Sequence, residues 1–269
     1  MASSSRRKLL GGNRQGTFHC WARCVRRAFL CGRDPYTKKD YSHRRLWIMK
    51  REEQLAALFT IDIEFHTELS NHLHIVLRTC PRAAKKLTPE EVVRRWLTIT
   101  KLSKCFTDEL PEVDEKRVKE LAKDKKKVAK LRKRLSKVSW FMGTLLENIA
   151  RRSNCEDDTS GKFWSTRYGC RECTDPGAVL ICGIYVDLNL IRAGEASSVQ
   201  TARFSSVYQR LQARKQSRNS KSRADGWLAE LTLRPERKNE EHLADSSRTG
   251  RRATDMGVLP MSLEDYVYL

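Results

Sequence analysis

Hydrophobic and polar residues alternate along three stretches of the chain, which predicts β-strands at residues 18–24, 59–68 and 72–78. Successive side chains of a strand project from opposite faces, so each stretch has one apolar face. These faces consist of Phe18, Cys20, Ala22 and Cys24, then of Ile61, Ile63 and Phe65, and finally of Leu73, Ile75 and Leu77. Because only a short turn separates the second and third stretches, we expect them to pair as antiparallel neighbours.

Longer segments repeat their apolar residues every three or four positions, as helices do when one side packs on a core. These segments cover residues 40–58, 88–99, 114–152 and 175–192. Thr88, Pro89 and Glu91 have the spacing of a capping box with proline at the first helical position. The segment 114–152 predicts one long helix, for which Glu112 and Gly143 are the candidate break points. Together, the strands and helices indicate an α+β protein.

The charge of the chain points to a polyanionic partner. Lys and Arg number 53 against 33 Asp and Glu, which gives a formal net charge of +20. Nucleic acid is the first candidate to neutralise such an excess, and an anionic membrane surface is the second. Within the segment 114–152, Lys126, Lys127 and Lys130 belong to a strongly basic helical face. That face is either simply solvated or tracks phosphates, and the global charge favours phosphates.

Hydrophobic runs, the N-terminal composition and the cysteines indicate the cellular compartment of the protein. No apolar run approaches the roughly 20 residues of a membrane-spanning helix, and the basic, Ser-rich N-terminus lacks the hydrophobic stretch of a secretory signal. We therefore expect a cytoplasmic protein with no membrane partner. Nine cysteines, several of them within apolar segments, predict reduced and buried thiols. The pair Cys170 and Cys173 leaves a structural zinc site open.

His72 and His74 are the first candidate site residues. They lie two positions apart on a predicted strand and so share one face. Two neighbouring imidazoles make half of a metal site, although a solvated histidine pair is the simpler interpretation. Further along, Tyr185 and Asn189 are four residues apart on a predicted helix and therefore also share a face. A tyrosine hydroxyl can attack a phosphodiester, and a divalent ion held by two imidazoles and an amide oxygen can take up the developing charge.

Four stretches of this sequence resemble the REP-associated single-tyrosine transposases of the HUH endonuclease superfamily, across about residues 16–211. They are Ser-Asn-His72-Leu-His74-Ile-Val-Leu-Arg, Tyr185-Val-Asp-Leu-Asn189-Leu-Ile-Arg192-Ala-Gly, Gly161-Lys-Phe-Trp164-Ser-Thr-Arg167-Tyr and Cys24-Val-Arg-Arg-Ala-Phe-Leu-Cys-Gly32. The family motifs are a His-hydrophobe-His strand, a tyrosine helix that ends in Ala-Gly, and a Phe-Trp segment between them. Here Leu190 stands where the family usually has proline after the asparagine.

The resemblance implies a ferredoxin-like antiparallel sheet, the HUH palm, with packed helices and a basic helical insertion at residues 112–152. His72, His74 and Asn189 would hold Mg²⁺ or Mn²⁺, and Tyr185 would cut and rejoin single-stranded DNA through a 5′-phosphotyrosine link. The substrates would be DNA hairpins, and the protein could be a homodimer. The residues expected to contact DNA are Arg26, Arg27, Lys126, Lys127, Lys130, Lys162, Trp164, Arg167 and Arg192. Core packing is an equally good interpretation of Trp164 and its aromatic neighbours.

Outside the HUH transposase domain at residues 16–211, we expect a disordered basic N-terminus at 1–15 and a mostly flexible tail at 212–269. Apolar residues near Trp227 and Leu263 could dock two segments of that tail. Two rival functions remain open. One is a catalytically inactive, truncated relative that only binds nucleic acid. The other is a hydrolytic metalloenzyme that uses Glu64 or Glu68 as a general base. Tyr168 is a second candidate nucleophile, but it has no asparagine one turn later.

Overall fold

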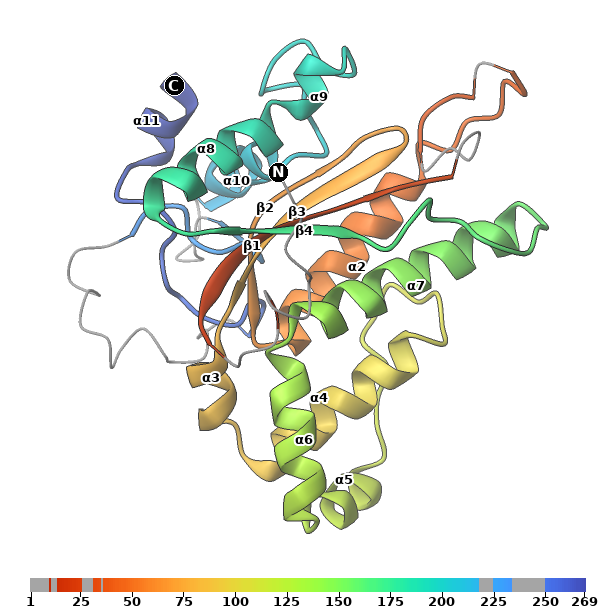
Figure 1. The fold of residues 1–269 in the computed structure, drawn as a ribbon, viewed down its shortest axis with the longest axis vertical. Helices are drawn as coiled ribbons and strands as arrows, with labels where there is room; N and C mark the ends of the chain where they lie inside the picture. The colour runs from red at the N-terminus through yellow and green to blue at the C-terminus, as the bar shows by residue number, and fades with distance from the viewer. Residues whose placement is uncertain (1–9, 11–13, 26–30, 35, 218–224, 234–249) are drawn as a thin grey trace.

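A four-stranded antiparallel sheet forms the centre of the molecule in the computed structural model (Figure 1). The structure describes residues 10, 14–25, 31–34, 36–217, 225–233 and 250–269. The strands are β1 (Gly16–Arg23), β2 (Ile61–Glu68), β3 (His72–Thr79) and β4 (Gly169–Cys173), in the order β2-β3-β1-β4. All three strand pairs are antiparallel, and the two central strands place Trp21 opposite His74. The expected pairing of the second and third strands is therefore confirmed.

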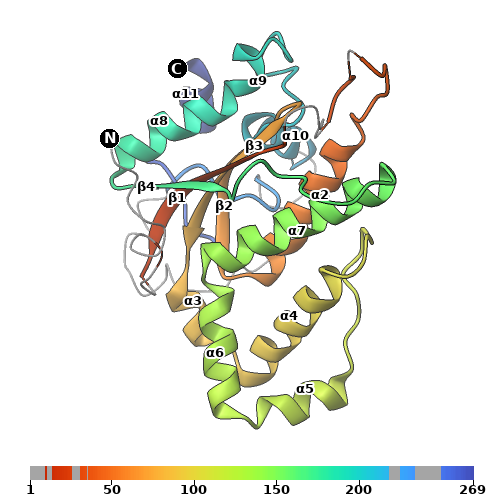
Figure 2. The same ribbon diagram turned by 45° about the vertical axis from the view of Figure 1, so that its right-hand side comes forward.

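Helices cover both faces of the sheet. Their bounds are α2 (Arg44–Leu58), α3 (Pro81–Lys86), α4 (Pro89–Leu102), α5 (Glu115–Ala122), α6 (Lys125–Leu135), α7 (Val138–Glu156), α8 (Pro176–Asp187), α9 (Asn189–Arg192), α10 (Ser206–Ser217) and α11 (Leu263–Tyr268). Figures 1 and 2 show α2 and α7 along one face, with α4, α5 and α6 beyond them, and α8, α10 and α11 on the opposite face. Each face of the sheet has its own buried apolar cluster. The strand order and the β1-α2-β2-β3-helices-β4 connections are those of a ferredoxin-like fold, which confirms the predicted α+β class.

A β-bulge in β2 changes the faces predicted for this strand. The register with β3 shifts between Ile63 and Phe65, so one extra residue is inserted into β2 at Glu64. Ile61 and Ile63 belong to the apolar cluster on the α2 side, whereas Phe65 belongs to the cluster on the α8 side. The prediction that Phe65 shares the face of Ile61 and Ile63 is therefore wrong, because a bulge reverses the alternation that follows it.

The segment predicted as one long helix is instead three helices, α5, α6 and α7. The breaks lie at residues 123–124 and 136–137, not at Glu112 or Gly143. The Asp124 side chain accepts a hydrogen bond of 2.9 Å from the Lys127 amide, which starts α6 as a new helix. The capping box at Thr88 and Glu91 is present as predicted and starts α4. Helix α2 begins at Arg44, four residues later than expected.

Two segments that follow α10 in the sequence lie against the sheet rather than away from it. Leu231, Leu259 and Leu263 are buried in the apolar cluster under α8, as the docking prediction requires. The expectation that the tail is mostly flexible stays a prediction. Residues 1–9 and 11–13 lie outside the described residues, so the expected N-terminal disorder is not addressed by the structure.

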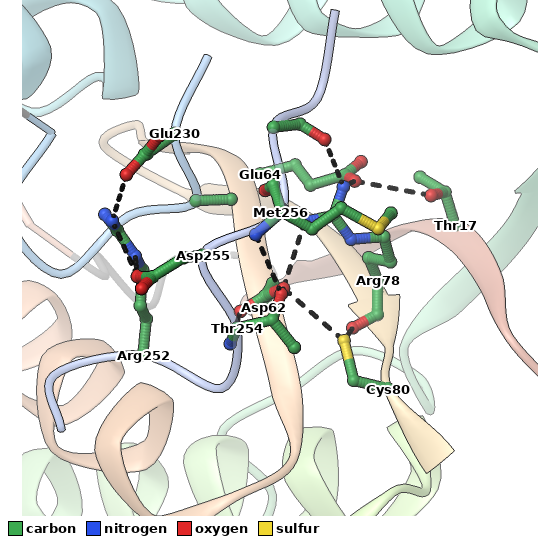
Figure 3. A network of polar contacts seen from close by, with 12 residues as sticks. Thr17, Asp62, Glu64, Arg78, Cys80, Glu230, Arg252, Thr254, Asp255 and Met256 are labelled. Carbon is green, nitrogen blue, oxygen red and sulfur yellow. Dashed lines mark hydrogen bonds and ion pairs between the residues drawn. The ribbon is translucent and has the colours of Figure 1, made fainter. Parts of the chain in front are cut away.

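A buried ion-pair network fastens the C-terminal segment to the sheet (Figure 3). Arg78 on β3 forms ion pairs of 3.0 Å with both Asp62 and Glu64 on β2. The same guanidinium donates to the carbonyl oxygens of residues 256 and 257, at 2.8 and 2.9 Å. Asp62 in turn accepts hydrogen bonds from the backbone amide and the hydroxyl of Thr254. Because each buried charge in this network has partners, the segment is fixed across β2 and β3.

Candidate functional site

His74 and Tyr185 lie next to each other, although more than a hundred residues separate them in the sequence. Their ring centroids are 5.5 Å apart in an edge-to-face arrangement. His72 follows on the same face of β3, with its ring centroid 5.0 Å from that of His74. Tyr185 is 40% exposed and therefore accessible to a partner. The predicted strand of histidines and the predicted tyrosine helix thus meet at one surface of the sheet.

Close packing between α8 and β2 positions Tyr185. A Cβ atom added at Gly183 would lie 2.6 Å from the Phe65 ring, so glycine permits an approach that a larger side chain would block. Val179 and Val186 on α8 belong to the same buried cluster as Phe65. The Asp175 side chain begins the helix by accepting a hydrogen bond from the Ala178 amide. Packing and capping together fix both the position and the start of the tyrosine helix.

The end of α8 is held by a buried carboxylate. Asp187 accepts hydrogen bonds from the Ser206 hydroxyl at 2.5 Å, the Val207 amide at 2.8 Å and the Tyr266 hydroxyl at 2.8 Å. Burial raises the pKa of Asp187, and the nearby Arg210 and these three hydrogen bonds act in the opposite direction. The contacts join α8 to α10 and α11, so residues far along the chain hold the helix that carries Tyr185.

The segment after α8 is tied to the turn before His72. Leu190 packs with Leu69 in a small buried cluster, and the Glu195 carboxylate accepts a hydrogen bond of 3.0 Å from the Ser70 amide. Glu195 also pairs with Arg45 at the start of α2. Leu190, the residue that departs from the family pattern, therefore has a packing role at this junction.

His19 is a third histidine at the site, which the sequence did not reveal. Its Nε2 atom lies 2.8 Å from Nδ1 of His74, and the two rings stack with centroids 5.0 Å apart. The available signal was the alternation of the first strand, which places His19 on the face opposite Phe18 and Cys20. That signal could not be used before the structure showed β1 and β3 to be neighbours.

The three imidazoles are neutral near pH 7. Burial lowers the pKa of His74 to about 3, with His19 and His72 adding to the effect. Burial also lowers the pKa of His19 to about 4, with a further contribution from the positive charge of Arg171. The pKa of His72 is lowered by burial and by Arg23. Neutral rings retain a lone pair on one nitrogen, which is the form that binds metal ions.

The hydrogen bonds of His72 and His74 fit metal ligation. The Asn71 side-chain oxygen lies 2.5 Å from Nδ1 of His72, so this nitrogen donates and Nε2 keeps its lone pair. His74 can likewise donate from Nδ1 to His19 and leave its own Nε2 free. Asn189 begins α9, and its amide nitrogen is a buried donor with no partner among the described residues. No contact that we find joins Asn189 to either histidine within the described ranges, so its ligand role stays a prediction.

An open cavity of about 690 Å³ lies between the sheet and α8. Its lining includes His19, His74 and Tyr185, together with Trp21 and Arg171. Neither His72 nor Asn189 belongs to this lining. The cavity therefore exposes the tyrosine and one predicted metal ligand beside a cation and an aromatic ring, a composition suited to a phosphate and a base.

The predicted DNA-contact residues do not form one continuous surface in the structure. Lys126, Lys127 and Lys130 are exposed on α6, which lies beyond the sheet face opposite α8 (Figures 1 and 2). Arg192 lies on the tyrosine side, with its guanidinium carbon 5.7 Å from the centroid of the Tyr185 ring. Lys162 and Arg167 are exposed in the segment before β4. Arg26 and Arg27 lie outside the described residues.

Trp164 is half-buried and packs against the core. Its indole nitrogen donates a hydrogen bond of 2.8 Å to the carbonyl oxygen of Leu146, and its ring contacts the larger apolar cluster. Phe163 beside it is buried. Of the two interpretations of these aromatic residues, the structure favours core packing over base stacking.

The residues of the rival hydrolase are not assembled around His74. Glu64 pairs with Arg78, and Glu68 pairs with His66. Tyr168, the second candidate nucleophile, packs against the apolar cluster on the α2 side of the sheet. Cys170 and Cys173 are three residues apart on β4 and so project from opposite faces, which argues against their forming one zinc site.

Two further observations concern metals and membranes. Glu52, His66 and Glu68 each place one ligand atom within 4.8 Å of the others, a cluster that the sequence did not indicate.

Within the described ranges, no helix is both long and apolar enough to cross a membrane.

The sequence and the fold were both compared with those of known proteins, and only the comparison of folds found a similar protein. No family model matches the sequence, and no curated protein matches it. The chain is similar to a solved structure described as the REP-associated tyrosine transposase bound to a REP hairpin. The two share 13% sequence identity, the match covers 87% of this chain and 96% of that chain, and the TM-score is 0.42. A likeness this distant does not assign a function, so the residues of the site have to support it.

Proposed function

We propose that this protein is a DNA transposase that cuts and rejoins single-stranded, hairpin-forming DNA with Tyr185 as the nucleophile. The observation that carries the proposal is the meeting of Tyr185 with His74 at an open cavity, with ring centroids 5.5 Å apart. The sequence motifs also predict that these two distant segments belong to one site. The net charge of +20 supplies an independent reason for a polyanionic substrate.

The chain's own residues account for the chemical steps. The Tyr185 oxygen attacks the phosphorus atom of a phosphodiester, and a tyrosine-phosphorus bond replaces the bond between phosphorus and the 3′ oxygen. The departing 3′ oxygen takes up the proton that the phenol loses. The product is a 5′-phosphotyrosine and a free 3′-hydroxyl, and the reverse reaction rejoins DNA. Arg192, whose guanidinium lies near the Tyr185 ring, would hold a phosphate at the nucleophile.

His72 and His74 would hold Mg²⁺ or Mn²⁺, with Asn189 as the proposed third ligand. When bound, the ion would stabilise the charge that develops on the scissile phosphate. His19 would orient His74 through their hydrogen bond, and Asn71 would do the same for His72. The role of these two partners is to keep the ligating nitrogens pointed at the same place.

The basic residues of α6 lie far from the cavity around Tyr185 (Figures 1 and 2). Lys126, Lys127 and Lys130 are exposed on α6, which lies away from α8 (Figure 2). We propose that the single-stranded tail binds at the cavity and that the duplex stem contacts α6 in this protomer or in a second one.

A covalent-adduct assay tests the function. The protein is incubated with Mn²⁺ and a 5′-tailed hairpin oligonucleotide, and the DNA-linked protein is separated by denaturing electrophoresis. The wild type should form an adduct, Tyr185→Phe should form none, and Tyr268→Phe should behave as the wild type because Tyr268 is 93% exposed on α11 and does not line the cavity. Tyr168→Phe tests the rival nucleophile.

Three results would contradict the proposal. If wild type and Tyr185→Phe both lack an adduct but bind the hairpin in a salt-dependent way, the protein is a binding module. An adduct that survives in Tyr185→Phe would assign the attack to another residue. A cleaved product with a free 5′-phosphate and no protein attached would indicate a hydrolytic metalloenzyme.

A further inference from the structure

Glu52, His66 and Glu68 form a fully buried cluster on the α2 side of the sheet. Glu52 lies on α2, and the other two lie on β2 after its bulge. All three are 0% exposed. Nδ1 of His66 lies 2.8 Å from a Glu68 oxygen and 3.3 Å from a Glu52 oxygen. His72 and His74 project from the other face of the sheet, toward α8, so the cluster is separate from the site around Tyr185.

Most polar atoms of this cluster have no hydrogen-bond partner. Both oxygens of Glu52, one oxygen of Glu68 and Nε2 of His66 are buried and unpartnered among the described residues. Two buried carboxylates side by side repel each other and lose their hydration, which is strongly unfavourable without a counter-charge. Asp62 and Glu64 are also two buried neighbouring carboxylates, but both form ion pairs with the Arg78 guanidinium.

The donor set is that of a metal site. One imidazole nitrogen and carboxylate oxygens are ligands for Zn²⁺, with bonds of about 2.0–2.2 Å. Ligand atoms around a tetrahedral ion of that size lie roughly 3.3 Å from one another. The two distances from Nδ1 of His66, 2.8 and 3.3 Å, are within a few tenths of an ångström of this value. A small outward shift of Glu68 would therefore bring both distances from Nδ1 of His66 to this value, and the ligand atoms of Glu52 and Glu68 lie within 4.8 Å of each other.

We propose that Glu52, His66 and Glu68 bind one structural divalent transition-metal ion, of which Zn²⁺ fits the donors best. The ion binds Nδ1 of His66 in the tautomer that carries its proton on Nε2, neutralises both carboxylates and joins α2 to β2. The centroid of the Trp227 ring lies 5.2 Å from that of the His66 ring, so a residue of the segment after α10 packs beside the cluster. Because the three ligands are fully buried, the ion is taken up during folding and exchanges slowly in the native protein.

A retained proton is the competing explanation. Burial and the neighbouring Glu68 raise the pKa of Glu52 well above its usual range. A protonated Glu52 could donate to Glu68 and relieve the repulsion without any metal. The two explanations make opposite predictions for Glu52→Gln. A glutamine amide can replace the protonated carboxyl as a donor, but it is a poor substitute for a carboxylate that ligates a metal.

The experiment uses the full chain with His72→Ala and His74→Ala, so that ions at the other site do not contribute. The protein is unfolded in denaturant in the presence of a chelator and is then refolded with an excess of Zn²⁺. After desalting, its zinc content is measured by atomic emission. We expect about one ion per chain, and about a tenth of that or less after Glu52→Gln. Glu53→Gln is the matched control, since it removes the same charge one residue away, where the carboxylate pairs with Lys50. This control should retain the ion.

The outcome does not depend on DNA cleavage. Refolding with a chelator in place of Zn²⁺ should lower the melting temperature of the parent and of Glu53→Gln, and leave that of Glu52→Gln unchanged. If the refolded parent holds no zinc, the proposal fails regardless of how the variants fold. Zinc retained by a folded Glu52→Gln protein would equally overturn it. X-ray absorption at the zinc edge should show one nitrogen and carboxylate oxygens, whereas sulfur ligands would also reject this site.

Discussion

Two glycines inside helices provide a paired test of how Tyr185 is positioned. Gly183 lies on α8, where an added Cβ would be 2.6, 2.7 and 2.9 Å from three atoms of the Phe65 ring. Gly143 lies on α7 and has no atom within 4 Å of such a Cβ. Replacement by alanine gives the same gain of about 1 kcal/mol in helix propensity at either position. The difference between the two variants therefore isolates the contact with Phe65.

The Phe65 ring has little room to move away. It is 0% exposed, it stacks on Tyr266 with centroids 5.9 Å apart, and the Arg210 guanidinium lies 5.2 Å from its centroid. An extra methyl group in such a packed place typically costs about 1–3 kcal/mol. We expect Gly143→Ala to stabilise the protein by about 1 kcal/mol. Gly183→Ala should then be less stable than Gly143→Ala by about 2 kcal/mol.

Urea unfolding measures both free energies, and the adduct assay measures the consequence for the site. Because α8 must shift away from β2, Tyr185 moves relative to His74, and a misplacement of about 1 Å can lower the rate by about a hundredfold. Gly183→Ala should therefore form adduct at least tenfold more slowly, while Gly143→Ala keeps the wild-type rate. Equal stabilisation by the two alanines would refute the packing argument. A destabilised Gly183→Ala protein with an unchanged rate would show that this contact does not position Tyr185.

Two further predictions follow from the contacts around the site and from the basic helix. Asp187→Ala removes the acceptor of three buried hydrogen bonds and should lower the free energy of unfolding by about 2–4 kcal/mol, whereas Asp187→Asn retains one acceptor and should lose less. Equal losses in urea unfolding would argue against the hydrogen bonds as the cause. Replacing Lys126, Lys127 and Lys130 together by alanine should reduce the slope of log affinity against log salt by about 2–3 for a hairpin DNA. An unchanged slope would remove α6 from the DNA-binding surface.

Local patterns in the sequence determined much of the secondary structure. The alternation around His72 and His74 predicted a strand with both imidazoles on one face, and the structure has that strand. The capping box at Thr88 was equally readable, because a helix start depends on a few adjacent residues. The order of the motifs favours Tyr185 over Tyr168, which is partly buried and packs against the core.

Features that depend on distant partners were not readable from the sequence. The bulge at Glu64 reversed the second half of β2, because register is decided by pairing with β3 and not by local alternation. His19 became a site residue only when β1 paired with β3 and brought it to His74. The break at residues 136–137 involves a distant partner, because the Thr60 amide donates to the Leu135 carbonyl oxygen and the Thr60 hydroxyl lies 2.8 Å from that of Ser136. The break at residues 123–124, by contrast, has a local cap at Asp124.

The strand of histidines and the tyrosine helix were thus fixed by local spacing, whereas their meeting was decided by tertiary packing. Gly183 allows α8 to reach Phe65, and Asp187 ties the helix end to α10 and α11. The buried cluster of Glu52, His66 and Glu68 has the same origin, because only the bulge turns His66 and Glu68 toward α2. Sequence spacing determines which side chains share a face, and the packing of faces against one another determines which chemistry they can perform.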